Sequence, residues 1–410
     1  MSTSDSAVCD LVPPQTRARP HIGYLDGIRG LAALYVLISH VQGCAFQLVT
    51  ANGLLMRIAG TLDYAVLGFG HFAVDVFIVL SGYCLMLPVA ARPQGTLSGG
   101  FWGFFKRRFR RIVPPYLAAL FVSIVVNYVT PPSGTLPSGA ELLSHLLLVH
   151  NLGPWHHAIN GPMWSVAVEW QIYFVFALLL LPVWRRFGAA ASILFGFTVG
   201  LLPHFLLASS MNWDWSCPWY IGLFALGMCA AAGQGKRRSD RASSRPIPWG
   251  LAALAALSAA LGMYFFLRAG WEHVHWMQPM RRVLKSSPWL PDVAIGVSAT
   301  SLLLYLAAPA NHSNRLRSFL EHRLIERLAL MSYSLYLIHL PFVYLVYILV
   351  KRAAMPQLVG YVLQIVVGLP VGLLAGWMLY QTVERRFQSR PAARPALPLE
   401  VPGSQLAAVS

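Results

Sequence analysis

Residues 162–183 read PMWSVAVEWQIYFVFALLLLPV, a stretch with a single charged residue, Glu169. A helix rises about 1.5 Å per residue and the bilayer core is about 30 Å thick, so about 20 apolar residues are needed to cross it. This stretch therefore predicts a membrane-spanning helix. Nine further apolar segments meet the same expectation and lie at 27–48, 71–91, 112–129, 189–208, 218–233, 248–268, 291–309, 328–350 and 358–382.

The composition of the whole chain is that of a membrane protein. Of its 410 residues, 56% are hydrophobic and 11% are charged, whereas roughly 25% are charged in an ordinary soluble domain. We therefore expect an all-α, polytopic transmembrane helical bundle of about ten spans. The segment 140–152 is too short to cross and is expected to be re-entrant or interfacial.

Positive charge is unevenly distributed among the loops. The net charge of +16 is compatible with nucleic-acid binding, with an anionic lipid surface, or with the Lys and Arg excess of cytoplasmic loops. If both termini are cytoplasmic, 24 of the 31 Lys and Arg residues lie inside and seven lie outside. This bias predicts cytoplasmic termini and no nucleic-acid partner.

The apolar segments form one membrane domain, predicted at 21–387. Residues 1–20 are polar and Pro-rich, without the apolar core of a cleavable signal peptide. The tail 388–410 is rich in Pro and Ala. We expect both terminal segments to be disordered and cytoplasmic.

Several common chemistries are disfavoured by the motifs that the sequence lacks. The five cysteines form no C-x-x-C pair, which argues against a metal site or a disulfide framework. His156 and His157 form an isolated pair in an outer loop, and we expect no metal. There is no Walker loop, dinucleotide fingerprint or G-x-S-x-G elbow, which argues against an ATP-driven machine and a serine hydrolase.

Ionisable residues inside a span are costly, so each is a candidate functional residue. In YLDGIRGLAALYVLISH, residues 24–40, His40 follows Arg29 by eleven positions. The helical rise places His40 about 16 Å deeper than Arg29, near the middle of the membrane. An imidazole there could take a proton from a hydroxyl group. The alternative is a packing histidine hydrogen-bonded to a neighbouring span.

A basic run precedes the third predicted span, in FFKRRFRRIVPPY at 104–116. On a helix, Arg107, Arg110 and Arg111 share a face that could bind phosphates, and Arg108 belongs to the same run. The phosphates of coenzyme A are one candidate. The alternatives are a topogenic charge cluster or a contact with lipid head groups.

Glu169 is the second ionisable residue that lies deep in a span. It lies seven residues, or about 10 Å, from the outer start of its helix, a depth close to that of His40. A carboxylate beside an imidazole can fix its tautomer and stabilise the protonated form. Alternatively, Glu169 caps a broken helix or pairs with an arginine.

Two further spans carry polar stripes. In MSYSLYLIH, residues 331–339, Ser332, Tyr336 and His339 fall on one face and are expected to line the substrate or to hold helices together. In HFAVDVFIVLSGYCL, residues 71–85, Asp75 and Ser81 are expected to be structural or substrate-lining. The Ser81-Gly82 pair favours close helix approach.

Five of these motifs, in this order, resemble acyltransferase family 3, and the resemblance covers about 21–387. They are LDGIRGLAAL with Arg29 and His40, VDVFIVLSGY, KRRFRRIVPPY, WSVAVEWQIYF and SYSLYLIH. Members of this family are integral-membrane enzymes of the cell membrane that transfer acetyl and other acyl groups to sugars, polysaccharides and some secondary metabolites.

The resemblance implies roles for particular residues. His40 is expected to be catalytic and Arg29 essential, while Arg107, Arg108, Arg110 and Arg111 are expected to meet acyl-CoA on the cytoplasmic side. The family commonly has two successive acidic residues where this chain has Glu169 followed by Trp170, so Glu169 would act alone. Many relatives carry an extracytoplasmic hydrolase-like domain at the C-terminus, and we expect none here.

These observations favour an integral-membrane O-acyltransferase. Acyl-CoA, most simply acetyl-CoA, would be the donor substrate and not a bound cofactor, and the acceptor would be a carbohydrate or another hydroxyl compound. His40 would act as general base, with Glu169 orienting it. The alternatives are a proton-coupled transporter or flippase and a non-catalytic scaffold. The sequence indicates neither the acceptor nor the oligomeric state.

Overall fold

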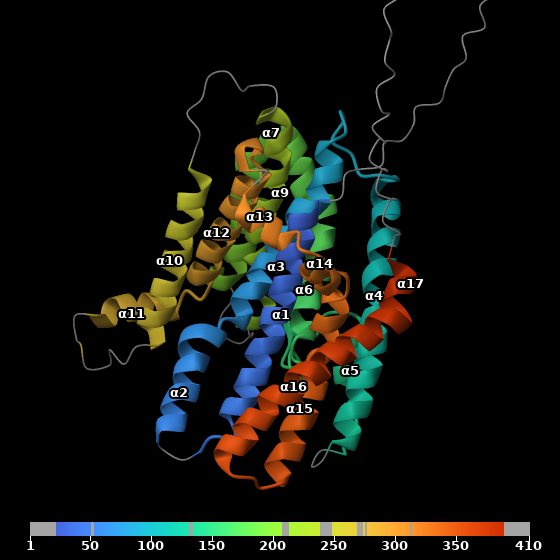
Figure 1. Ribbon diagram of the computed structural model, residues 1–410. Coiled ribbons are helices and arrows are strands. Elements are labelled where there is room, and N and C mark those ends of the chain that lie inside the picture. The colour runs from blue at the N-terminus through green and yellow to red at the C-terminus, as the bar shows by residue number, and fades with distance from the viewer. Residues whose placement is uncertain are drawn as a thin grey trace, which may run out of the picture.

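A computed structural model describes residues 22–50, 53–130, 134–206, 213–237, 248–268, 274, 277–311 and 314–388. Every regular element in these ranges is helical (Figure 1), as the sequence predicted. The predicted disordered segments, 1–20 and 388–410, lie outside the described residues except for Gln388, which hydrogen-bonds to Glu384 and to the Leu330 carbonyl oxygen.

The helices follow one another with short connections. Their bounds are α1 Gly23–Phe46, α2 Leu54–Leu62, η1 Asp63–Leu67, α3 Gly70–Ala90, α4 Gly100–Val129, α5 Gly139–Leu146, η2 His150–Leu152, α6 Met163–Val175, η3 Phe176–Leu180, α7 Leu181–Leu206, α8 Trp213–Ser216, α9 Tyr220–Arg237, α10 Trp249–Arg268, α11 Gln278–Lys285, α12 Trp289–Ala307, η6 Pro309–Asn311, α13 Arg315–Leu320, α14 Arg323–Leu330, α15 Ser332–Arg352, α16 Gln357–Leu379, η7 Tyr380–Glu384 and α17 Arg385–Phe387.

Eight helical segments of the described chain are long and apolar enough to cross a membrane, whereas the sequence predicted ten. The continuous segment Met163–Leu206 contains two of the predicted spans, which are separated by a kink at Gly188, where φ is 85°. The apolar part of α9, Tyr220–Gly233, is shorter than the other spans. The segment predicted to be re-entrant or interfacial forms the short helix α5 and the turn η2.

Helix α4 begins at Gly100, well before the predicted start at 112. Lys and Arg are good helix formers, so the basic run continues the helix instead of preceding it. The helix also passes through Pro114 and Pro115 without ending. As a result, the basic residues are held rigidly on the same element as the span.

Helices α3 and α9 approach each other through glycine. A Cβ atom on Gly82 would lie 2.1 Å from the carbonyl oxygen of Phe224, and one on Gly227 would lie 2.0 Å from that of Val79. Each glycine therefore packs directly against the backbone of the opposite helix. Small residues allow membrane helices to approach closely in this way. This contact agrees with the close approach that the Ser81-Gly82 pair favoured.

Helices α1, α15 and α16 pack together at the end of the bundle opposite the start of α1 (Figure 1). Hydrogen bonds between buried side chains tie this group together. Tyr361 of α16 donates to Gln42 of α1 at 2.9 Å, and Gln42 donates to the carbonyl oxygen of Ala59 in α2 at 3.1 Å. Such pairing is required because the membrane interior offers no water to polar groups.

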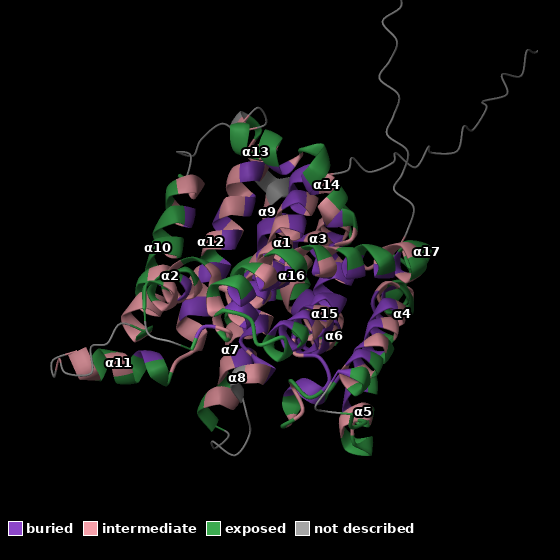
Figure 2. Ribbon diagram, turned by 60° about the horizontal axis from the view of Figure 1, so that its bottom comes forward, coloured by how far each residue is buried: buried purple, intermediate pink, exposed green. Residues whose placement is uncertain are grey.

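Burial is greatest in the middle of the bundle and least at its rim (Figure 2). In the most apolar 18-residue stretch of α15, 67% of the residues are buried, whereas 11% are buried in the corresponding stretch of α10. Helices α10 and α11 lie at the periphery (Figure 1). The functional candidates on α1, α3, α6 and α15 therefore belong to the enclosed part of the molecule, whereas α4 also has an exposed side.

Candidate active site

A cavity of about 200 Å³ lies between α1, α3, α4, α6 and α15. We call it the central cavity. It gathers side chains from segments that are far apart in the sequence. Its charged and polar lining includes Arg29, Ser81, Arg108, Arg111, Glu169 and Tyr336.

Glu169 is held in the wall of this cavity by two hydroxyl groups. Ser81 Oγ donates to Glu169 Oε1 at 2.7 Å, and the Tyr173 hydroxyl donates to the same oxygen at 2.6 Å. Tyr173 lies one helical turn after Glu169 on α6, a spacing that the sequence already contained. These bonds fix the carboxylate between α3 and α6.

Three guanidinium groups face the same cavity. Arg29 is 20% exposed, binds Asp26 at 2.9 Å and donates to Cys84 Sγ at 3.6 Å. Arg108 and Arg111 lie one turn apart on α4. Because Glu169 is the one carboxylate of the described lining, positive charge predominates, and the cavity suits an anionic or carbonyl-bearing ligand.

The basic run divides between two sides of α4, and the division differs from the predicted one. The sequence placed Arg107, Arg110 and Arg111 on one face. In the structure Arg108 and Arg111 line the cavity, whereas Arg107 and Arg110 are exposed and Arg107 donates to the Ser98 carbonyl oxygen at 2.6 Å. Helix α4 therefore turns Arg108 and Arg111 toward the core and Arg107 and Arg110 away from it.

His40 lies against His339 of α15. The two ring centroids are 5.0 Å apart, and His339 Nε2 lies 3.1 Å from His40 Nδ1. His339 Nδ1 donates to the Leu335 carbonyl oxygen at 2.8 Å, so in the neutral ring Nε2 is an acceptor. The sequence had placed His339 among the substrate-lining residues, but it lies outside the described lining of the central cavity.

The tautomer of His40 follows from its contacts. Its Nδ1 lies 2.9 Å from the Val36 carbonyl oxygen, and this oxygen and His339 Nε2 can each only accept. His40 Nδ1 therefore carries the proton, and its Nε2 carries the lone pair. In this arrangement Nε2 is the atom of His40 that can accept a proton.

His40 and Glu169 lie at different depths, contrary to the expectation from the sequence. A Cβ atom on Gly70 at the start of α3 would lie 2.9 Å from Ser39 Oγ, beside His40. Ser81, the partner of Glu169, is eleven residues further along α3, or about 16 Å. Both residues are described, and the imidazole of His40 is oriented by His339 and the backbone and not by Glu169.

Tyr336 lies between these two groups. It lines the central cavity, and its hydroxyl is 2.6 Å from Ser165 Oγ. Its ring centroid is 6.2 Å from that of His339. Ser332, from the same predicted stripe, also lines the cavity and donates to the Ala329 carbonyl oxygen at 2.8 Å.

Histidines of the segments between α4 and α6 pack closely, which the sequence did not indicate. His156 and His157 contact the ring of Trp215 at 5.1 and 4.2 Å between centroids, so they are not isolated. Burial lowers the pKa of His157, and the charge of His156 lowers it further. His150 stacks on His145 at 4.0 Å, and burial, followed by the charge of His145, lowers the pKa of His150 to about 3.

Comparison with known proteins assigns the chain to a family. Residues 22–381 match the family model described as an acyltransferase domain. The chain belongs to acyltransferase family 3. It is therefore an integral-membrane acyltransferase, as the motifs indicated, and it is similar to O-acetyltransferases of the same family.

Relatives of this acyltransferase family 3 chain are distant. It is 21% identical to the O-acetyltransferase OatA of Staphylococcus aureus over 338 residues, which cover 78% of the chain and 50% of that protein. It is 29% identical to protein 2 in the picA locus of Rhizobium radiobacter, over 41% of the chain and 83% of that protein. The peptidoglycan O-acetyltransferase OatA of Listeria monocytogenes is 23% identical over 45% of the chain and 28% of its own length.

The chain thus spans about half the length of the first of these relatives. No solved structure gives a significant match.

Proposed function

We propose that the chain is an O-acetyltransferase that moves an acetyl group from cytoplasmic acetyl-CoA to a hydroxyl group of a glycan. The observation that carries this proposal is the convergence of Arg29, Arg108 and Arg111 with Glu169 around one cavity of an acyltransferase. Two similar proteins are named as O-acetyltransferases, one of them as a peptidoglycan O-acetyltransferase, which favours a glycan acceptor.

The donor enters from the side where α1 begins. The excess of Lys and Arg supports a cytoplasmic location for this side and for both termini, with ten crossings if the kinked segment Met163–Leu206 and α9 are counted as three. The basic part of α4 lies at the same side, near Arg29. The basic residues of α4 are then the first part of the protein that acetyl-CoA contacts.

The central cavity is too small to hold the whole donor. Pockets for drug-sized ligands measure about 300 Å³ or more, so a cavity of about 200 Å³ holds part of the pantetheine arm of the donor and not its nucleotide. The phosphates of the nucleotide remain outside, next to the exposed Arg107 and Arg110. Arg108 and Arg111 then contact the pantetheine arm inside, and the thioester lies beyond them toward His40.

His40 acts as the general base. Its Nε2 takes the proton of the acceptor hydroxyl, the oxygen attacks the thioester carbonyl carbon, the carbon–sulfur bond breaks, and the leaving thiolate receives the proton from His40. To reach this atom, the donor must extend about 16 Å along α1 beyond Arg29. His339 accepts the bond from His40 Nδ1, which orients the ring and stabilises it when protonated.

The proposal is tested by measuring thiol release in membranes that contain the folded protein, acetyl-CoA and peptidoglycan fragments. We expect release to require the acceptor and to fall about 100-fold or more in His40→Ala, because a general base contributes about 10² to 10⁴ in rate. Background release from the folded wild type with every acceptor tried would contradict acyl transfer and favour a transporter.

A second experiment compares acetyl-CoA with acetyl-pantetheine, which lacks the nucleotide. Arg111→Gln should raise KM for both donors, because this residue lines the cavity. Its matched control Arg110→Gln, on the exposed side of the same helix, should raise KM only for acetyl-CoA. If both variants raised KM equally for both donors, this would contradict the proposal that the cavity and the exposed arginines bind different parts of the donor.

A further inference from the structure

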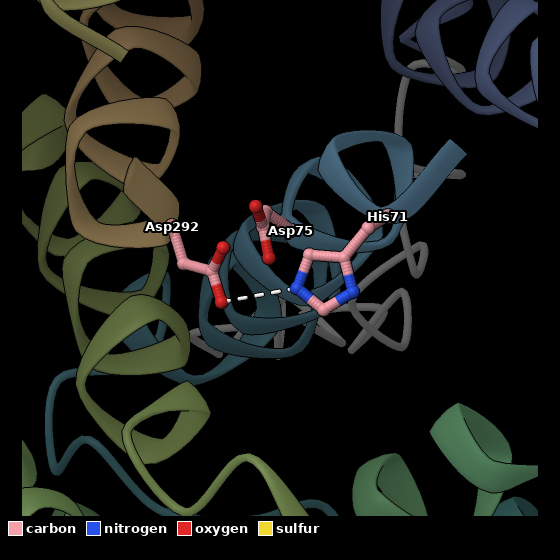
Figure 3. Close-up of side chains that lie close together, drawn as sticks. All are labelled: His71, Asp75 and Asp292. Carbon is pink, nitrogen blue, oxygen red and sulfur yellow. Dashed lines mark hydrogen bonds and ion pairs between the residues drawn. The ribbon is translucent and has the colours of Figure 1, made fainter. Parts of the chain in front are cut away.

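A second polar cluster lies on the outer half of α3, apart from the central cavity. His71 and Asp75 occupy successive turns of α3, and Asp292 extends toward them from the first turn of α12 (Figure 3). One ligand atom from each residue lies within 4.8 Å of the others. His71 Nε2 is 3.1 Å from Asp292 Oδ2.

The cluster is enclosed except at His71. Asp75 is 0% exposed, and Asp292 is 2% exposed, while the His71 side chain is 38% exposed. Trp219 Nε1 donates to Asp292 Oδ2 at 2.8 Å, and the Tyr220 hydroxyl lies 3.2 Å from His71 Nε2. His71 therefore provides the route by which a small ligand enters.

Asp75 is the feature that points to a ligand. Both of its carboxylate oxygens are buried and make no hydrogen bond of ordinary geometry in the described part of the chain, although the Tyr220 hydroxyl lies nearby. Its carboxylate points toward His71 and Asp292 in Figure 3. A buried carboxylate is costly unless it is protonated, paired or bound to a metal, so the cluster favours a positive ligand on the side that Asp75 faces.

The donor set selects the class of ligand. Two carboxylates balance the charge of one divalent cation, and a neutral imidazole adds a nitrogen donor. Mg²⁺ and Ca²⁺ prefer oxygen donors alone, whereas Zn²⁺ binds His and Asp at about 2.0 to 2.2 Å with tetrahedral geometry. Ligand atoms on such an ion are about 3.4 Å apart, which small side-chain rotations reach from the observed cluster.

We propose that His71, Asp75 and Asp292 bind one Zn²⁺ ion. The ion joins the outer end of α3 to α12, and through Trp219 and Tyr220 to α9. It also fixes the part of α3 where Gly70 contacts Ser39 next to His40. The sequence analysis predicted no metal, because the third ligand is 217 positions from Asp75 and no local pattern links them.

The test uses the purified full chain in lipid nanodiscs, with any metal-binding tag removed. The protein is stripped with a chelator, equilibrated with Zn²⁺ alone, and analysed by elemental mass spectrometry and calorimetric titration. We expect one equivalent of zinc per chain and a higher melting temperature with zinc. Asp75→Asn and Asp292→Asn should each weaken zinc binding at least about tenfold.

The matched control is Glu384→Gln, which alters a buried membrane carboxylate paired with Ser334 and should leave zinc binding unchanged. If Asp75→Asn does not fold, His71→Gln replaces it, because this side chain is partly exposed. The proposal is overturned if the folded wild type takes up no zinc, if it prefers Mg²⁺ or Ca²⁺, or if Asp75→Asn and Glu384→Gln retain zinc equally.

Discussion

At the scale of single residues, the contact between His40 and His339 defines the candidate chemistry. His40 Nδ1 donates both to the Val36 carbonyl oxygen and to His339 Nε2, so one tautomer is imposed on the ring. His339 is itself held by the Leu335 carbonyl oxygen. The ring that we propose as the base is therefore positioned by a second ring, a role the sequence had assigned to Glu169.

Replacing His339 tests this positioning role. We expect His339→Leu to lower kcat about 10- to 100-fold, because it removes the acceptor that orients His40. KM for acetyl-CoA should be unchanged, since His339 lies outside the described lining of the central cavity. Steady-state kinetics in membranes measures both constants.

The conservative control is His339→Gln, whose amide oxygen can still accept from His40 Nδ1 and should restore part of kcat. A merely structural role would lower the amount of folded protein in both variants and leave kcat per folded molecule unchanged. That result would contradict the assignment of His339 as a positioning residue.

The sequence identified candidate residues better than it identified their partners. Arg29, Ser81, Glu169 and Tyr336 were recognised because a polar side chain in an apolar stretch is costly, and all four line one cavity. The pairing of His40 with His339 joins positions 299 residues apart, which no local pattern encodes.

One local signal of the cluster of His71, Asp75 and Asp292 is present in the sequence. His71 and Asp75 are four residues apart, a spacing that places two ligand-type side chains on one face of a helix. The third member, Asp292, comes from another helix, so it required the tertiary structure.

At the scale of elements, the crossing of α3 and α9 depends on two glycines that face the opposite backbone. We expect Gly82→Ala to lower the melting temperature and the yield of folded protein, because its Cβ would lie 2.1 Å from the Phe224 carbonyl oxygen. Overpacking a well-filled contact costs about 1 to 3 kcal/mol. Thermal unfolding in detergent measures the effect.

The matched control is Gly262→Ala in α10, where a Cβ would meet nothing within 4 Å. Alanine is favoured over glycine inside a helix by about 1 kcal/mol, so this variant should be neutral or slightly stabilising. Equal melting temperatures for Gly82→Ala and wild type would contradict the described crossing.

The long apolar helices could be predicted from the sequence because hydropathy over about 20 residues is a local property. The short helices α2, α13 and α14 could not, because their positions depend on tertiary contacts. Gly27 and Gly30 of α1 leave room for the backbone at Leu320 and Ala329. The glycines of LDGIRG thus hold α13 and α14 against α1, which the motif alone does not reveal.

At the scale of the whole molecule, the proposed orientation places opposite ends of the bundle in different compartments. We expect Met355→Cys, between α15 and α16, to react with a membrane-impermeant maleimide in intact spheroplasts. Arg186→Cys, at the other end, should react only after permeabilisation. Both native side chains are exposed, and the unsubstituted chain controls for its own cysteines.

Labelling of Arg186→Cys in intact spheroplasts, together with protection of Met355→Cys, would invert the orientation. The donor cavity would then open away from the compartment that contains acetyl-CoA, and the proposed direction of acyl transfer would be wrong. The expected orientation rests on the distribution of Lys and Arg over the complete chain.

The peripheral position of α10 has a consequence for the divergence of related sequences. Only 11% of the residues in its most apolar stretch are buried, so in a membrane we expect its exposed side chains to face lipid chains, which adapt to any apolar shape. We therefore expect the exposed positions Leu251 and Leu254 to tolerate any apolar residue, whereas Tyr264, which contacts Phe69 and Phe72, should tolerate fewer. The same tolerance makes α10 the natural place to introduce a fluorophore or a rigid fusion for imaging without altering the catalytic core.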